Sequence, residues 1–187
     1  MSSDMHELVQ DLSLEKCILL GHSMGGKTAM QFALEHSTSL DKLIVADMAP
    51  RYYSPHHQSV LQGLQAVDFK IIKNRKEAEQ ALSQYIDDNG TKQFLLKNIY
   101  WKDNGEMDWR FNLNVISKQI ENVGKAIQAD ASCDVPTLFV RGEKSDYIQD
   151  SDLEQIKEMF PRSFVETIPD AGHWIHAEQP KAFLKCI

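Results

Sequence analysis

Cysteine is scarce in this sequence, and its spacing fits neither a metal site nor a disulfide framework. The 187 residues include Cys17, Cys133 and Cys186, with no CxxC pair among them. Each lies in or beside an apolar run, where cysteine usually behaves as a small buried hydrophobe. We therefore expect three free thiols in the core, and neither a redox centre nor a structural metal.

Long apolar runs and an excess of positive charge are also lacking. No run approaches the roughly 20 apolar residues of a membrane-spanning helix, and the first residues carry acids instead of the basic and apolar regions of a secretory signal. The formal net charge of -7 disfavours a nucleic-acid partner, because phosphate binding needs clustered Lys and Arg. These features predict a soluble cytoplasmic protein with a small neutral or apolar ligand. A mitochondrial matrix location would need an upstream targeting segment.

Ordinary globular composition, with 42% apolar and 25% charged residues, indicates a folded core. Both ends of the chain alternate between short apolar runs and helical periodicity. The runs that predict buried strands are residues 17–20, 43–46, 135–140 and 164–168. Apolar strands separated by helices imply a mostly parallel sheet with helices on both faces, which is the doubly wound α/β plan.

The middle of the chain, residues 51–131, lacks strand patterns and instead carries successive helical faces. We predict a helical lid or cap there, inserted into a core formed by residues 1–50 and 132–187. Such an insertion would close over a ligand site at the edge of the sheet and set the size of the ligand. On burial grounds, three aromatic residues are expected in the lid's own core: Phe94, Trp101 and Trp109.

A G-x-S-x-G motif lies at residues 21–25, between an expected strand and an expected helix. Small neighbours on both sides would let Ser23 sit on a tight turn with its hydroxyl above the sheet. The helix N-terminus that follows favours developing negative charge. The motif therefore predicts Ser23 as a nucleophile, with the backbone N–H of Met24 in an oxyanion hole.

A serine hydroxyl needs a base, and one histidine stands where this fold usually places it. His173 follows the last expected strand and precedes the final helix. His176 would lie in that helix, and a zinc pair with His173 lacks further ligands. His56 and His57 are adjacent and without nearby ligands, so we interpret them as residues of the surface or of the lid entry. No metal or cofactor is expected.

Two aspartates are candidates for the acid that orients this base. Asp47 and Asp146 both follow predicted strands, at the sheet edge where catalytic groups gather. Both also lie between Ser23 and His173 in the chain, which is the order typical of the fold. A helix cap or a surface charge is the alternative for either aspartate.

These motifs resemble those of the YbfF/ABHD11-like esterase family of the α/β-hydrolase superfamily, from about Met5 to the end of the chain. The segments that carry the resemblance are G-H-S-M-G-G-K at 21–27, D-M-A-P at 47–50, Q-F-L-L at 93–96, W-R-F-N at 109–112, P-T-L-F at 136–139 and G-H-W-I-H-A at 172–177. The resemblance implies hydrolysis of carboxylic esters with short or medium acyl chains, without metal or cofactor. It favours Asp47 as the acid, whereas the general logic of the fold favours Asp146.

The resemblance also implies N-terminal strands and a His-Gly loop with a second oxyanion donor, which this sequence does not contain. Losing one such donor typically costs about a hundred- to a thousandfold in rate. The chain is therefore expected to be a partial core, and an inactive fragment that pairs through an exposed sheet edge is one alternative. A thioesterase or a carbon–carbon hydrolase with the same triad is another. The sequence does not indicate the oligomeric state.

Overall fold

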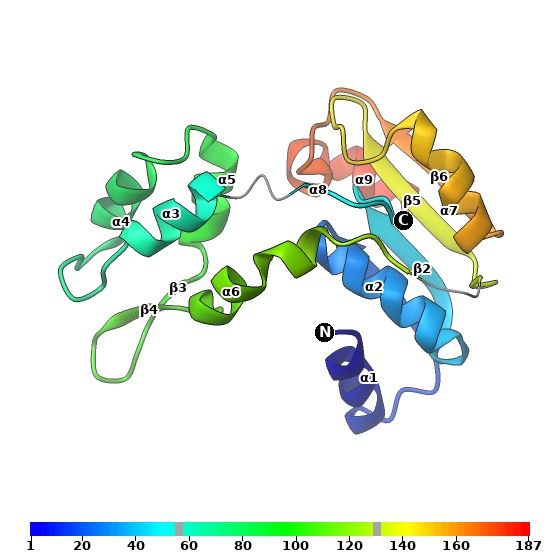
Figure 1. Cartoon of the computed structure of the whole chain (residues 1–187), viewed down its shortest axis with the longest axis horizontal. Coiled ribbons are helices and arrows are strands. Elements are labelled where there is room, and N and C mark those ends of the chain that lie inside the picture. Colours follow the sequence, from blue (N-terminus) through cyan, green and yellow to red (C-terminus); the bar gives the residue numbers. More distant parts are fainter. Residues whose placement is uncertain (55–57, 129–131) are drawn as a thin grey trace. The chain divides into compact units, whose positions relative to one another are not determined.

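The computed structural model describes residues 1–54, 58–128 and 132–187. The chain divides into two compact units (Figure 1): a larger one, Met1–Tyr52 with Lys125–Ile187, and a smaller one, Tyr53–Gly124. The smaller unit falls within the range in which the sequence predicted a cap. His56 and His57 lie outside the described residues.

A four-stranded sheet forms the centre of the larger unit, and every neighbouring pair in it is parallel. Its strands, in spatial order, are β1 (Cys17–His22), β2 (Leu40–Ala46), β5 (Thr137–Gly142) and β6 (Ser163–Ile168). Their carboxyl ends lie within two residues of one another, since His22 pairs with Ala46, Ala46 pairs with Val140, and Gly142 pairs with Ile168. The segments that follow the strands therefore leave the sheet at one edge.

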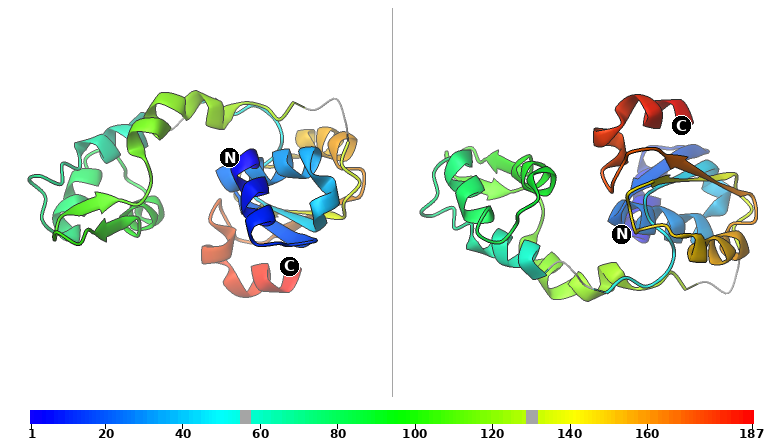
Figure 2. Two further views of the ribbon diagram at one scale, coloured as in Figure 1. Left: turned by 90° about the horizontal axis from the view of Figure 1, so that it is seen from below. Right: turned by 90° about the horizontal axis from the view of Figure 1, so that it is seen from above.

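Helices lie on both faces of this sheet (Figure 2). The helical segments of the larger unit are α1 (Ser2–Asp11), α2 (Met24–Glu35), η1 (Ser37–Ser39), η2 (Asp150–Asp152), α7 (Leu153–Met159), α8 (Ile175–Glu178) and α9 (Pro180–Cys186). On one face, α2 lies over Val45, and Phe160 at the end of α7 packs edge-on against Phe139, with ring centroids 5.7 Å apart. The opposite face buries Val140 beneath α8 and α9.

The edge strands are less buried than their apolar sequences predicted. Ile18 and Leu20 of β1 are 57% and 43% exposed, and Phe164 of β6 is 71% exposed. Leu20 pairs with Ile44, so its side chain lies on the face that α8 and α9 cover. Among the described residues, the core beneath those helices includes no residue of β1. Continuous apolar character thus indicates full burial only for the central strands.

In its described residues, the smaller unit consists of helices and one short hairpin. Its elements are α3 (Gln58–Ala66), α4 (Arg75–Leu82), α5 (Asn89–Leu96), β3 (Ile99–Trp101), β4 (Met107–Trp109) and α6 (Leu113–Gly124). β3 and β4 pair antiparallel, so the expectation of no strands in this segment was wrong. The turn between them uses Gly105 at φ 81°, a conformation that glycine adopts without strain. Strands of three residues are too short for an alternating pattern to reveal them.

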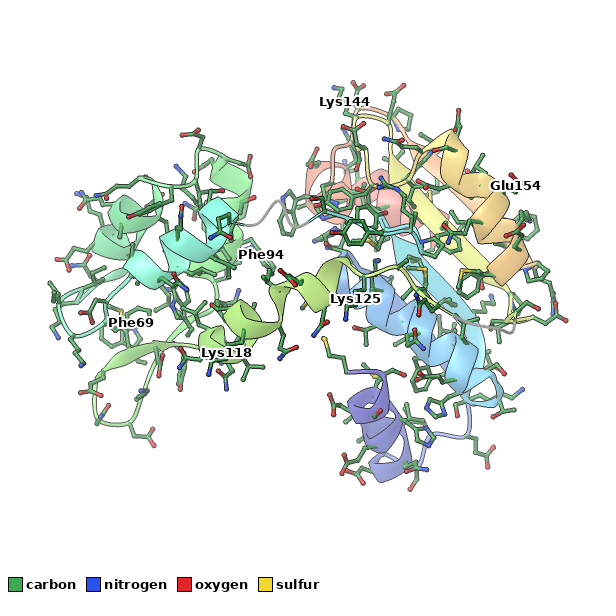
Figure 3. All side chains as sticks on the ribbon, in the orientation of Figure 1. Phe69, Phe94, Lys118, Lys125, Lys144 and Glu154 are labelled. Carbon is green, nitrogen blue, oxygen red and sulfur yellow. The ribbon has the colours of Figure 1, made fainter. Side chains whose placement is uncertain are left out.

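One apolar cluster holds the smaller unit together, with Leu82, Ile99 and Trp109 among its buried members. Of the three aromatic residues expected in this core, only Trp109 is buried. Phe94, labelled in Figure 3, is 47% exposed and Trp101 is 56% exposed. The expectation for these two was wrong. A short helix or hairpin packs against the core with one side, and aromatic residues on its other side stay exposed.

Two further expectations concern thiols and membrane spans. The three cysteines are free thiols; Cys133 is buried, while Cys17 and Cys186 are only partly so. None of the helices in the described ranges is long and apolar enough to cross a membrane.

Candidate active site

Ser23 sits on a strained turn between β1 and α2. Its backbone has φ 54° and ψ -120°, in the left-handed half of conformational space that non-glycine residues rarely occupy. The turn is close-packed, because a Cβ added at Gly21 would lie 2.2 Å from the carbonyl oxygen of Gly25. At Gly25 itself an added Cβ would meet nothing within 4 Å. Within the motif the steric need for glycine therefore lies at Gly21 and not at Gly25. On the far side of the serine the tight position is Gly26, where an added Cβ would lie 3.1 Å from Cβ of Met48.

Main-chain hydrogen bonds fix this turn to the sheet and to the helix that follows. The N–H of Ser23 donates to the carbonyl of Ala46 at 3.1 Å, and its own carbonyl accepts from the N–H of Lys27 at 3.1 Å. Met24 is the first residue of α2, where a backbone N–H has no acceptor within its own helix. That placement suits the predicted oxyanion donor, and the Met24 side chain is 37% exposed.

The structure brings His173 and Asp47 together. Nδ1 of His173 lies 2.8 Å from Oδ2 of Asp47, whose side chain is fully buried, while that of His173 is 20% exposed. A carboxylate only accepts, so Nδ1 carries the proton and Nε2 is left as the basic nitrogen. The pair therefore has the arrangement of an oriented base and its acid.

Asp47 has further donors that hold its carboxylate in place. Its Oδ1 accepts from the N–H of Gly142 at 3.2 Å, and its Oδ2 accepts from the hydroxyl of Ser145. The backbone of Asp47 is also held, since its N–H donates to the carbonyl of Val140 at 2.8 Å. Its φ of 49° turns the chain sharply where β2 ends. These donors hold the carboxylate in one orientation beside His173.

Asp146 does not join this arrangement. Its side chain is exposed, and its backbone carbonyl accepts from the guanidinium of Arg51 at 2.8 Å. The loop after β5 presents the neighbouring hydroxyl of Ser145 to Asp47 instead. The general logic of the fold, which favoured Asp146 as the acid, is therefore not followed in this geometry.

The sequence did not single out two residues of this loop that lie at the site. Ser145 donates to Asp47, and the ring of Tyr147 stacks on the ring of His173, with centroids 3.9 Å apart and planes 20° apart. Burial raises the pKa of the Tyr147 phenol. A serine and a tyrosine flanking Asp146 form no motif by themselves, so only the strand-end position of the loop could have indicated them.

The loop that carries His173 is anchored on several sides. Glu178 accepts from the N–H of Gly172 at 2.6 Å and of Trp174 at 3.0 Å. Lys144, labelled in Figure 3, forms an ion pair with Asp170, its Nζ 2.8 Å from Oδ1. These contacts attach the loop both to α8 and to the segment that follows β5.

His22, immediately before the candidate nucleophile, was also missed. Its Nε2 lies 2.8 Å from the backbone carbonyl of His173. Its ring is 4.7 Å from the ring of His173, 5.3 Å from that of Trp174 and 4.8 Å from that of His176. Burial is the main cause that lowers the pKa of His22 from 6.5 to about 4, so the ring is neutral near pH 7.

Lys27 is the buried cation nearest along the chain to the serine turn, at 7% exposure. Its ammonium donates to the carbonyl of Arg51 at 2.7 Å and to that of Lys125. Burial, and next the charge of Arg51, lower the pKa of Lys27 to about 8. Lys27 thus holds together the two segments through which the chain leaves and re-enters the larger unit.

Within the described ranges, no group of three or more His, Cys, Asp or Glu side chains is placed to hold a metal ion. The residues at this sheet edge are instead Ser23, two histidines and Asp47, with the hydroxyl of Ser145 donating to Asp47. Such a set can perform nucleophilic and acid–base chemistry.

This fold and this site define a class. A model of the alpha/beta hydrolase family matches residues 2–185, and the chain belongs to that family. The predicted fold class is confirmed: a parallel sheet with helices on both faces and a serine turn between strand and helix.

Particular relatives narrow the comparison. The sn-1-specific diacylglycerol lipase ABHD11 of Danio rerio is 37% identical over 193 residues, covering 100% of this chain and 61% of the relative. The esterase YbfF of Escherichia coli is 32% identical over 188 residues, covering 100% and 72%. The resemblance to YbfF/ABHD11-like esterases is therefore confirmed. The chain spans about three fifths of the length of the fish relative.

A solved structure is closer still in sequence. A marine microorganism esterase matches with a TM-score of 0.93 and 44% identity, covering 100% of this chain and 76% of that one.

Proposed function

We propose that this chain carries the catalytic residues of a serine hydrolase for carboxylic esters. Ser23 is the nucleophile, His173 the general base and Asp47 the acid that orients it. The observation that carries the proposal is the contact of 2.8 Å between Nδ1 of His173 and the fully buried carboxylate of Asp47. This contact leaves Nε2 of the imidazole as the nitrogen able to take a proton from a serine hydroxyl.

The proposed reaction has two halves. In the first, the Ser23 hydroxyl attacks the ester carbonyl while His173 takes its proton, and the tetrahedral oxyanion accepts a hydrogen bond from the N–H of Met24. The carbon–oxygen bond to the alcohol then breaks, and His173 returns the proton to the departing oxygen. In the second half, water attacks the acyl-enzyme with His173 again as base, which releases the acid and restores Ser23.

The substrate class rests on similarity to proteins that are named as an esterase and a diacylglycerol lipase. We propose a neutral ester with a short or medium acyl chain. The net charge of -7 is compatible with an uncharged substrate and would repel an anionic one. No metal or cofactor takes part in the proposed chemistry.

Covalent labelling with a fluorescent fluorophosphonate tests the proposal. We expect the wild-type chain to label, and the Ser23→Ala and His173→Ala variants not to label. Ser39→Ala is the matched control, because Ser39 lies in η1 before the amino end of β2, whereas Ser23 follows the carboxyl end of β1. A folded wild-type chain that does not label, or a Ser23→Ala variant that still does, would refute the proposal.

The chemistry of the substrate needs a separate experiment. Rates on matched ester, thioester and diketone substrates would separate an esterase from a thioesterase or a carbon–carbon hydrolase with the same residues. We expect the ester to be turned over fastest. A large preference for either of the other two would replace the ester assignment while leaving the roles of Ser23, His173 and Asp47 unchanged.

A further inference from the structure

His22 has a contact that the reaction proposed above does not use. This residue lies directly before the nucleophile and ends β1, yet its side chain reaches the loop after β6, where its Nε2 lies 2.8 Å from the backbone carbonyl of His173. A carbonyl only accepts, so Nε2 of His22 carries a proton and donates it. The turn with the nucleophile and the loop with the base are thereby joined by one side chain.

We infer that His22 is a positioning residue, which holds the main chain of the base in register with the nucleophile through this hydrogen bond. The inference rests on the proposed function of Ser23 and His173. Asp47 fixes the imidazole of His173 from its Nδ1 side, and His22 fixes the backbone from which that imidazole projects. The two contacts together set both the direction and the position of the basic nitrogen.

The backbone beside His22 makes this an effective anchor. Ser23 is held at φ 54° by its close-packed turn, and its N–H donates to the carbonyl of Ala46. The His22 side chain is attached to this rigid turn, so it restrains movement of the His173 loop and does not move with it. Reacting groups must be placed within fractions of an ångström, and a shift of about 1 Å can cost a hundredfold in rate.

The neutral state of the His22 ring keeps Nε2 as the donor in this contact. Burial lowers the pKa of His22 to about 4, with smaller opposing effects from the His173 carbonyl and Asp47 and further lowering by His173 and His176. Near pH 7 His22 is therefore neutral, with the proton on Nε2 and a lone pair on Nδ1. A neutral donor positions the loop without placing a second positive charge beside His173 during the reaction.

A structural role alone would have a different signature. Burying a polar ring favours pairing its N–H wherever an acceptor is near, and losing such a bond would lower the melting temperature without changing turnover by the folded protein. A positioning role requires that kcat falls while KM changes little, since the distance between nucleophile and base affects the chemical step more than binding.

Two variants separate these cases. His22→Phe keeps an aromatic ring among its neighbours but removes the donor, whereas His22→Gln places an amide N–H near the former Nε2. We expect His22→Phe to lower kcat about 10- to 100-fold with KM nearly unchanged, and His22→Gln to recover most of that loss. His36→Phe, a ring substitution at the far end of α2, is the control and should keep kcat within about twofold.

Hydrogen exchange adds a readout that does not depend on turnover. We expect amides of residues 171–175 to exchange faster in His22→Phe than in the wild type, and His22→Gln to restore their protection. Unchanged kcat in a folded His22→Phe variant, or equal losses in the Phe and Gln variants, would overturn the inference. A wild type that neither labels nor hydrolyses esters would instead refute the proposed function. In that case the exchange experiment still tests the contact itself: equal exchange at residues 171–175 in His22→Phe and the wild type would show that His22 does not hold this loop.

Discussion

Asp47 and Asp146 are the same kind of residue in similar sequence positions, and their surroundings differ completely. Asp47 is fully buried, bonded to His173, Ser145 and the N–H of Gly142. Asp146 is exposed, and its backbone carbonyl accepts a hydrogen bond from Arg51. A single substitution at each position therefore tests the assignment of the acid.

We expect Asp47→Asn to lower kcat by about 10³- to 10⁴-fold, because a neutral amide neither orients nor stabilises the protonated imidazole. The matched Asp146→Asn variant should stay within about twofold of the wild type. Steady-state hydrolysis of an ester accepted by the wild type, or the rate of fluorophosphonate labelling, measures both. A large loss in the Asp146 variant with little loss in the Asp47 variant would exchange their roles.

His22 also affects stability, through its titration. The pKa of His22 has its ordinary value of 6.5 in the unfolded chain and is about 4 in the folded chain. Between these two pH values the unfolded chain therefore binds a proton at His22 and the folded chain does not. The free energy of unfolding must then fall as the pH drops from 6.5 towards 4, as far as this group is concerned. We expect His22→Gln to flatten this dependence, measured by urea unfolding at several pH values. Equal slopes in the two proteins would contradict the lowered pKa.

At the scale of elements, the carboxyl end of β5 meets the loop of the base. A Cβ added at Gly142 would lie 2.3 Å from the carbonyl oxygen of Gly172 and 2.5 Å from that of Ala171. These are backbone atoms, which cannot turn aside as a flexible side chain can. The absence of a side chain at Gly142 thus allows the His173 loop to pack against the strand.

We expect Gly142→Ala to lower the free energy of unfolding by about 1–3 kcal/mol, as overpacked sites do, and to lower kcat by displacing His173. Gly25→Ala is the stability control: its added Cβ meets open space near the start of α2, so we expect no loss of stability. Thermal unfolding and ester turnover report the two effects. A Gly142→Ala variant as stable and active as the wild type would show that the His173 loop can move away from the added Cβ without loss of stability or turnover.

At the scale of the whole molecule, two compact units have their own apolar clusters. One cluster lies within Tyr53–Gly124 and includes Leu82, which is fully buried. The other joins β2, β5 and β6 to α8 and α9 in the larger unit. Separate clusters imply that a cavity in one unit destabilises that unit first.

We expect Leu82→Ala to destabilise the smaller unit by about 2–5 kcal/mol, the usual range for a buried leucine. The control is Ile71→Ala in the same unit, where the side chain is 75% exposed and the effect should stay within about 0.5 kcal/mol. Hydrogen exchange followed by mass spectrometry should show faster exchange in residues 75–99 and unchanged exchange in β5. Equal acceleration in both units would show that they unfold as one.

The sequence by itself determined the class of fold and the pair of residues most central to the proposed chemistry. Apolar runs broken by helical patterns predict an alternation of strands and helices, and the G-x-S-x-G motif predicts a tight turn between a strand and a helix. Ser23 and His173 could therefore be named from local pattern and chain order. The same reasoning missed the hairpin β3–β4 and overestimated the burial of the edge strands. A strand of three residues is too short for a periodic pattern, and the apolar pattern of a strand does not show whether it lies at the edge of a sheet.

Only the tertiary structure separates the surroundings of the two aspartates and shows which residues contact His173. Asp47 and Asp146 both follow strands, so their sequence positions do not separate them. The difference lies in where the chain turns: φ 49° at Asp47 directs its carboxylate to His173, 126 residues further along, and Ser145 donates to the same oxygen. His22 meets the His173 loop 151 residues away in the same manner. Contacts across such separations depend on strand order and register, which no local pattern encodes.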